Sequence, residues 1–192
     1  MKTDLKVKLL QHLTQKKQDE GFTLIELLVV IIIIGILSAI ALPSFLNQAN
    51  KAKQSEAKTY VGSMNRAQQA YYLENNEFVT EIDNFGELGL GIAKETDNYL
   101  YRLKTDDAEK NVSNYADPRK KGTEDIDEKS SLKSYQGVVI LGQIKETGEA
   151  TTLAILCEAK KAVGLTGGVK AADAEIKIVD EQPECNDEWK KL

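Results

Sequence analysis

The stretch Glu20-Gly21-Phe22-Thr23-Leu24-Ile25-Glu26 leads directly into an apolar segment that runs from Leu27 to Leu42. This segment contains no charged residue, and its only hydroxyl side chain is Ser38. With its apolar flanks, which include Phe45 and Leu46, it is long enough to cross a bilayer core of about 30 Å, a distance that needs roughly 20 residues. We therefore predict a membrane-spanning helix.

The residues in front of the apolar segment differ from an ordinary secretory signal. In such a signal the cleavage site follows the apolar part, which is then discarded. Here the candidate cleavage point is Gly21, so that cutting would keep the apolar helix at the new N-terminus. Residues 1–21 carry five Lys against three acidic residues, and a positive flank stays in the cytoplasm. We expect the remainder of the chain to cross the membrane.

Glu26 is unusual because it is a carboxylate among apolar residues. Such a charge costs roughly 2.5 to 3.5 kcal/mol at the bilayer centre, less near the edge, and it marks a functional position by default. After cleavage the nearest cation would be the α-ammonium of Phe22. The alternative is that Glu26 lies near the interface and points into the headgroups.

Gly21-Phe22-Thr23-Leu24-Ile25-Glu26-Leu27-Leu28-Val29-Val30 resembles the class III signal of type IV pilins and pseudopilins, in its type IVa form. The resemblance implies that a prepilin peptidase cleaves after Gly21 and methylates the amine of Phe22. It also implies that Glu26 pairs with the N-terminus of a neighbouring subunit, that the helix kinks at Pro43, and that Gly35 to Pro43 loses helical order in the filament.

A weaker similarity to major pilins of photosynthetic bacteria extends further along the chain. It rests on Glu56-Ala57-Lys58, on Asn65-Arg66-Ala67-Gln68-Gln69-Ala70-Tyr71-Tyr72, and on a Cys near the end of the chain.

The composition argues against catalysis, cofactors and general nucleic-acid binding. The only His, His12, lies in the leader, so the mature chain cannot build Ser-His or Cys-His catalysis or a His-bearing zinc site, and two Cys are too few for a Cys-only one. Removing residues 1–21 changes the formal charge from −5 to about −7. The basic triplet Arg119-Lys120-Lys121 has acidic neighbours, and we expect a solvated loop there.

We divide the chain into four segments. Residues 1–21 form a cytoplasmic leader that is removed, and 22–46 form the transmembrane and filament-core helix. Residues 47–76 continue as an amphipathic helix half, and 77–192 form a globular β-sheet head. Helical periodicity defines a narrow apolar stripe that would pack on the head: Phe45, Ala49, Ala52, Tyr60, Met64, Ala67 and Tyr71, with Ala57 and Val61 beside the line. Asn75-Asn76 is the expected helix stop.

The fold class predicted for the head is α+β, with an antiparallel sheet of three or four strands laid on the helix. A glycine-containing loop from Glu77 to Asn98 precedes a first strand, Tyr99 to Leu103. Thr105 to Lys133 is polar and charged, and we expect a long exposed connection. The remaining elements are a hairpin formed by Tyr135–Leu141 and Thr151–Cys157, and a possible fourth strand, Glu175–Val179.

Cys157 and Cys185 should form a disulfide if the head is exported, and would remain free thiols if it is cytoplasmic. The positive leader favours export. Members of the resembled family commonly have a C-terminal disulfide that bounds a surface loop.

The resulting hypothesis is a structural pilin subunit that polymerises into type IV pili. It would begin as a single-pass precursor in the inner membrane and end in an extracellular pilus. Its partners would be prepilin peptidase, the assembly machinery, minor pilins and further copies of itself in a helical filament. The alternatives are a minor pilin, a pseudopilin of type II secretion and, more distantly, a membrane-anchored enzyme or sensor.

Overall fold

The computed structural model describes residues 22–144 and 148–192. The chain separates into two compact units whose boundary lies between Leu46 and Asn47. We call the described part of the first, Phe22–Leu46, the N-terminal unit and the second, Asn47–Leu192, the globular unit. The leader, residues 1–21, lies outside the described residues, so the expectations for its length and for Gly21 remain predictions.

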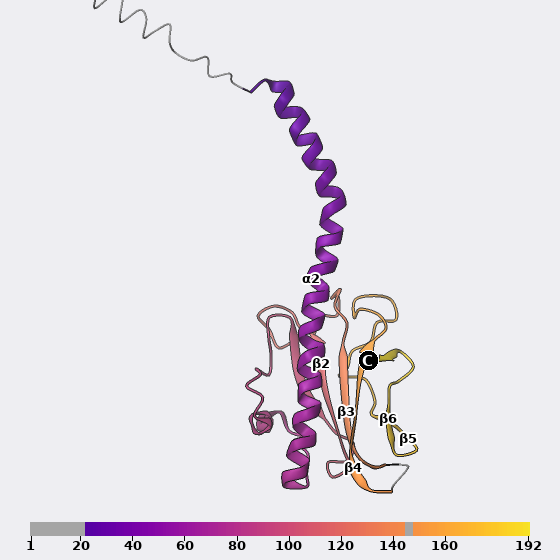
Figure 1. Cartoon of the computed structure of the whole chain (residues 1–192). Helices are drawn as coiled ribbons and strands as arrows, with labels where there is room; N and C mark the ends of the chain where they lie inside the picture. Colours follow the sequence, from indigo (N-terminus) through magenta and orange to yellow (C-terminus); the bar gives the residue numbers. More distant parts are fainter. Residues whose placement is uncertain (1–21, 145–147) are drawn as a thin grey trace, which may run out of the picture. The chain divides into compact units, whose positions relative to one another are not determined.

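One helix, α2 (Leu24–Asn75), contributes residues to both units (Figure 1). Pro43 lies inside the helix, and a kink there remains a prediction. The predicted stop is confirmed, because α2 ends at Asn75 and Asn76 adopts the left-handed conformation, with φ 59°. The backbone N–H of Asn76 still donates to the carbonyl of Tyr72 at 2.8 Å. A left-handed residue after the last turn is a common helix terminator, and Asn tolerates it well.

The globular unit contains a five-stranded antiparallel sheet in the order β1-β2-β3-β4-β7 and a separate β5-β6 hairpin (Figure 1). The elements after α2 are the 3₁₀ helix η1 (Ile82–Leu88) and the strands β1 (Tyr99–Lys104), β2 (Asn111–Pro118), β3 (Tyr135–Gln143), β4 (Ala150–Ala159), β5 (Lys177–Val179), β6 (Gln182–Glu184) and β7 (Trp189–Lys191). The α+β class, the first strand and the β3-β4 hairpin are confirmed.

Two strand predictions were wrong, and the main sheet has five strands where three or four were expected. The segment expected to be an exposed connection contains β2, which is buried along most of its length between β1 and β3. The strand predicted over Glu175–Val179 is present as β5, but it does not join the main sheet, since β5 pairs only with β6. The C-terminal tail instead supplies β7, whose Trp189 lies opposite Ala159 of β4.

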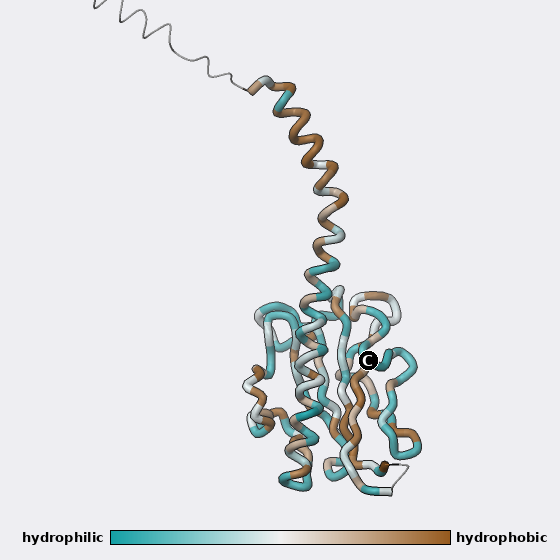
Figure 2. The backbone as a smooth tube through the Cα atoms, viewed as in Figure 1, coloured by the Kyte–Doolittle hydropathy of each residue, from teal (hydrophilic) through white to brown (hydrophobic). Residues whose placement is uncertain are grey.

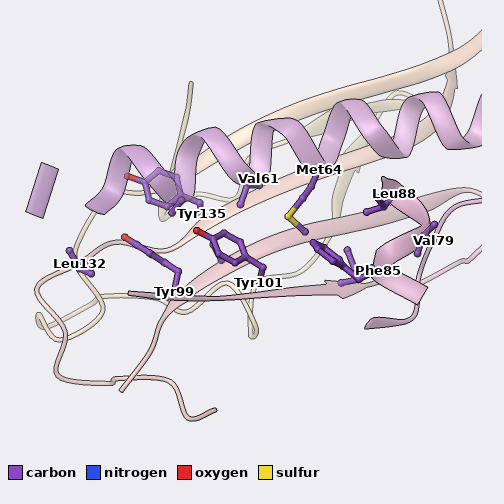
Figure 3. Close-up of a cluster of buried hydrophobic side chains, with 12 residues drawn as sticks. Val61, Met64, Val79, Phe85, Leu88, Tyr99, Tyr101, Leu132 and Tyr135 are labelled. Carbon is purple, nitrogen blue, oxygen red and sulfur yellow. The ribbon is translucent and has the colours of Figure 1, made fainter. Parts of the chain in front are cut away.

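The core between α2 and the sheet is built from a few small or flexible helix residues and a set of aromatic strand residues (Figure 3). Ala57, Val61 and Met64 of α2 are fully buried. They belong to one cluster with the tyrosines of β1 and β3. Figure 3 shows Val61 close to Tyr101, and Met64 beside Phe85. The predicted apolar stripe is shifted, because Ala52 is exposed, whereas Ala57 and Val61, expected beside the line, are fully buried. Burying this apolar surface is the main force holding the helix on the sheet.

A polar seam beside this core fixes where the helix sits on the sheet. The Asn65 amide donates to the carbonyl of Ile155 at 2.9 Å and accepts from the Asn114 amide at 2.8 Å. Gln68 is fully buried and forms a two-way pair with the backbone of Val79, at 2.7 and 3.0 Å. Because unpaired buried amides are costly, sliding the helix along the sheet would break several bonds at once.

Candidate functional site: the N-terminal helix and the disulfide-bounded loop

The helix α2 begins with a reciprocal hydrogen-bonded cap between Thr23 and Glu26. The Thr23 hydroxyl accepts from the Glu26 backbone N–H at 3.3 Å. The Glu26 carboxylate in turn accepts from the Thr23 backbone N–H at 2.9 Å and from its hydroxyl at 2.8 Å. This is a capping box, which satisfies otherwise unpaired donors at a helix start. The sequence interpretation missed it, although the Thr-x-x-Glu spacing is visible.

The capping box gives Glu26 a local role that competes with the predicted pairing between subunits. In the single chain the Glu26 carboxylate accepts hydrogen bonds from Thr23, the residue that follows Phe22. Phe22 itself precedes the helix and is 82% exposed. The carboxylate and the residue expected to carry the new N-terminus thus lie at the same exposed helix end.

Every large apolar side chain from Phe22 to Leu46 is exposed. Figure 2 shows that this segment is the longest predominantly hydrophobic stretch of the described chain. The exposed fraction is still 44% at Val30, the least exposed of these side chains. By length and composition, α2 is the one helix in the described ranges that is able to cross a membrane. An apolar surface of this extent requires a cover that the described residues do not supply.

Gly35 lies in the middle of this exposed surface. A Cβ added there would meet no atom within 4 Å, so a neighbouring helix has space to approach its backbone. Small residues allow such close approach between membrane helices. The roles predicted for Gly35 and Pro43 in a filament remain predictions.

Cys157 and Cys185 form a disulfide with a Cα–Cα distance of 5.8 Å. The pairing agrees with the expectation for an exported head. Cys157 lies in β4, and Cys185 follows β6, so the bond closes a loop that contains the β5-β6 hairpin. The loop also carries Leu165, which is 61% exposed.

Two charged residues of the sheet, which the sequence interpretation did not single out, hold the disulfide-bounded loop. Asp117 of β2 accepts from the backbone N–H groups of Ala171 at 2.7 Å and Ala172 at 2.8 Å. Lys104 of β1 donates to the carbonyls of the same two residues, at 2.8 and 3.0 Å, and also to that of Ala174. Burial raises the pKa of Asp117 and lowers the pKa of Lys104. Their partners are distant in sequence, so no local pattern reveals them.

Within residues 22–144 and 148–192, no group of three or more His, Cys, Asp or Glu side chains is placed to hold a metal ion. The arrangement is therefore that of an exposed apolar helix with a capped carboxylate, joined to a disulfide-bounded α+β unit.

Comparison with protein families identifies both parts of the chain. Residues 16–42 match the model of the prokaryotic N-terminal methylation motif. Residues 54–185 match the model described as type IV pilin-like G and H. The chain belongs to the type IV pilin-like family. This family is structural rather than enzymatic, and its relatives are named as pilins, fimbrial proteins and secretion core proteins.

The type IV pilin-like relatives include both pilus and secretion components. The type IV major pilin protein PilA of Myxococcus xanthus (strain DK1622) is 40% identical over 104 residues, which cover 52% of this chain and 44% of that protein. The type II secretion system core protein G of Vibrio cholerae serotype O1 is 31% identical over 119 residues, 57% of this chain and 79% of that protein. The type IV wide pilus major component PilA4 of Thermus thermophilus is 37% identical over 74 residues, 38% of this chain and 56% of that protein.

The similarity to pilins does not extend over whole chains. The chain spans less than half the length of the first curated relatives it matches, 44% and 46%. No solved structure matches the chain.

Proposed function

We propose that this type IV pilin-like chain is a structural subunit that is processed at its N-terminus and polymerises into a pilus. Prepilin peptidase cleaves after Gly21 and methylates the amine of Phe22. The subunit waits as a single-pass protein in the inner membrane with the globular unit outside. It then exchanges lipid neighbours for other copies of itself, with minor pilins and the assembly machinery as further partners.

The observation that carries this proposal is the apolar surface from Phe22 to Leu46. All its large side chains are exposed, whereas the globular unit buries a core of its own. The methylation-motif match over residues 16–42 supports retention of this surface in the mature protein. Lipid tails and neighbouring apolar helices offer equivalent cover, so a change from membrane to filament needs no refolding of the globular unit.

Glu26 is proposed to set the register between subunits. An unpaired carboxylate inside an apolar filament core is penalised, whereas one beside the Phe22 ammonium of a neighbour is compensated. On assembly Glu26 would leave the Thr23 cap, which is worth only about 0.5 to 2 kcal/mol, for that charged partner.

Mass spectrometry of the N-terminus of the purified protein tests the processing step. A mature chain that begins with methylated Phe22 is expected. Replacing Gly21 with a bulky residue should leave the unprocessed precursor in the membrane, and the conservative Gly21→Ala change is the matched control. An intact Met1 start on mature protein would contradict the proposal.

A second candidate is a core pseudopilin of a type II secretion system. It is favoured by the extent of the Vibrio cholerae match, which covers 79% of that relative. Fibres sheared from the cell surface distinguish the two. A pilin is their main component, while a pseudopilin is absent from them and its deletion stops the export of secreted proteins.

A further inference from the structure

A polar cleft lies in the globular unit beside the first turns that α2 contributes to it. The cleft has a volume of about 620 Å³, and its walls include Asn50 and Lys53 of α2 with Lys121, Lys129 and Ser131 from the chain between β2 and β3. The Asn50 amide donates to the Ser131 hydroxyl at 3.0 Å, which joins the two walls. This size lies within the range of ordinary small-ligand sites.

Within the described residues, three lysines line the cleft without taking part in the salt bridges of the globular unit. In the described part of the chain, the ammonium groups of Lys53, Lys121 and Lys129 form none of the salt bridges or side-chain hydrogen bonds found elsewhere in the globular unit. All three residues are exposed. They are available for a ligand.

The remaining charges near the cleft are divided between structural pairs and two opposing carboxylates. Arg119 is only 11% exposed and is paired with Glu95 at 3.3 Å, so its charge is compensated. The solvated loop predicted for Arg119-Lys120-Lys121 was thus wrong for Arg119. Glu124 and Glu128 of the same chain segment pair with Arg102 and Lys170.

Asp97 and Asp127 also line the cleft. Three free lysines against two carboxylates leave the cleft net positive, in a chain whose formal charge is −5.

The place of the cleft along the chain indicates what it binds. Asn50 and Lys53 follow Leu46 by four and seven residues, about 6 and about 10 Å along the helix axis. If Phe22–Leu46 spans the membrane, as proposed above, Asn50 lies within the headgroup layer, which extends roughly 5 to 8 Å beyond each side of the hydrocarbon core. Lys53 lies at the outer edge of that layer, within reach of its long side chain. Lysines at that level are attracted to anionic lipid and extend their ammonium groups to phosphate.

We propose that this cleft binds the phosphate headgroup of an anionic phospholipid while the subunit is stored in the membrane. Lys53, Lys121 and Lys129 supply the charge, and the Ser131 hydroxyl supplies a neutral donor. Binding holds the globular unit at the membrane surface, and assembly into a filament must release the lipid.

Lysine footprinting of the mature chain in lipid nanodiscs tests the cleft. Acetylation rates are measured by mass spectrometry in discs of phosphatidylcholine alone and in an equal mixture with phosphatidylglycerol. The rates at Lys53, Lys121 and Lys129 should fall about fivefold in the mixture, the effect of about one lysine near an anionic surface. Lys51 is the matched control, because it lies in the same turn and is exposed but does not line the cleft.

A double variant provides the second arm. Lys121→Gln with Lys129→Gln should abolish the protection of Lys53, whereas Lys51→Gln should leave it unchanged. Equal protection of Lys51 would mean that anionic lipid attracts all nearby lysines, and it would overturn the proposal of a specific site in the cleft. Protection by inorganic phosphate in phosphatidylcholine discs would show a free-anion site instead and would also overturn the proposal.

Insertion into the discs is verified first by protease protection. Lack of lysine protection in inserted protein overturns the lipid site alone. Failure to insert would overturn the proposed function together with it. Unprotected lysines combined with loss of pili in the double variant would assign the cleft to a contact between subunits.

Discussion

The N-terminal and globular units treat the same kind of residue in opposite ways. Val29 and Val61 both lie in α2, yet Val29 is 46% exposed and Val61 is fully buried. The difference comes from what surrounds the helix. The globular unit supplies a sheet and a polar seam, whereas the N-terminal unit contains helix alone. Secondary structure therefore does not decide burial, and an apolar helix without cover depends on other molecules.

The largest expected effect comes from removing the single charge of the N-terminal unit. Glu26→Leu should give processed, membrane-bound subunit but at least about tenfold fewer pili, because a buried neighbouring ammonium would lose its partner and 1.4 kcal/mol already equals a factor of ten. Sheared fibres are quantified against total subunit. Thr23→Ala is the control, because it removes the hydroxyl of the capping box and keeps the carboxylate. Wild-type piliation of Glu26→Leu would remove the register argument.

The second effect concerns the Cys157–Cys185 disulfide, which lies entirely within the globular unit. Replacing Cys157 and Cys185 together with Ala should lower its unfolding free energy by about 3 to 4 kcal/mol, as expected for a loop of this length. The melting temperature would fall by roughly 10 °C. The fluorescence of Trp189, which is buried in β7 and is the only Trp, reports the transition. Wild-type protein treated with a reductant should match the variant, and unchanged melting would show that the disulfide constrains little.

A matched pair of substitutions tests the contrast between the exposed and the buried half of α2. Val61→Ala should destabilise the globular unit by about 2 kcal/mol, since it removes two buried methyl groups and leaves a cavity. Val29→Ala should change the same unfolding free energy by less than about 0.5 kcal/mol. Both are measured by denaturant unfolding in detergent. Equal effects would mean that the two halves of α2 are energetically coupled.

The last effect, which is absent at neutral pH, is a loss of stability at high pH. All seven tyrosines lie in the globular unit, and burial raises the pKa of Tyr99, Tyr101 and Tyr135 above the usual value. The unfolded chain releases these protons near pH 10 and the folded chain does not, so stability falls as the pH rises above about 10. Tyrosinate absorbance should show the three residues ionising only on unfolding. Their ionisation in folded protein would contradict this.

Local pattern was sufficient for the apolar helix, its stop and the β3-β4 hairpin. It failed for β2, whose residues Asn114 and Asp117 are polar but buried. These side chains are tolerated because Gln68, Asn65 and backbone N–H groups from distant segments bond to them. A polar strand in a core looks like a loop until its partners are known.

The sequence alone determined the uninterrupted apolar run, the carboxylate of Glu26 directly before it and the helix-capping spacing of Thr23 and Glu26, and it predicted the cleavage motif, because each is a property of neighbouring residues. Only the tertiary structure decided that Lys104 and Asp117 hold the disulfide-bounded loop, and that free lysines meet in one cleft. Those contacts join residues far apart in the chain, and their free energy exists only when the sheet brings them together.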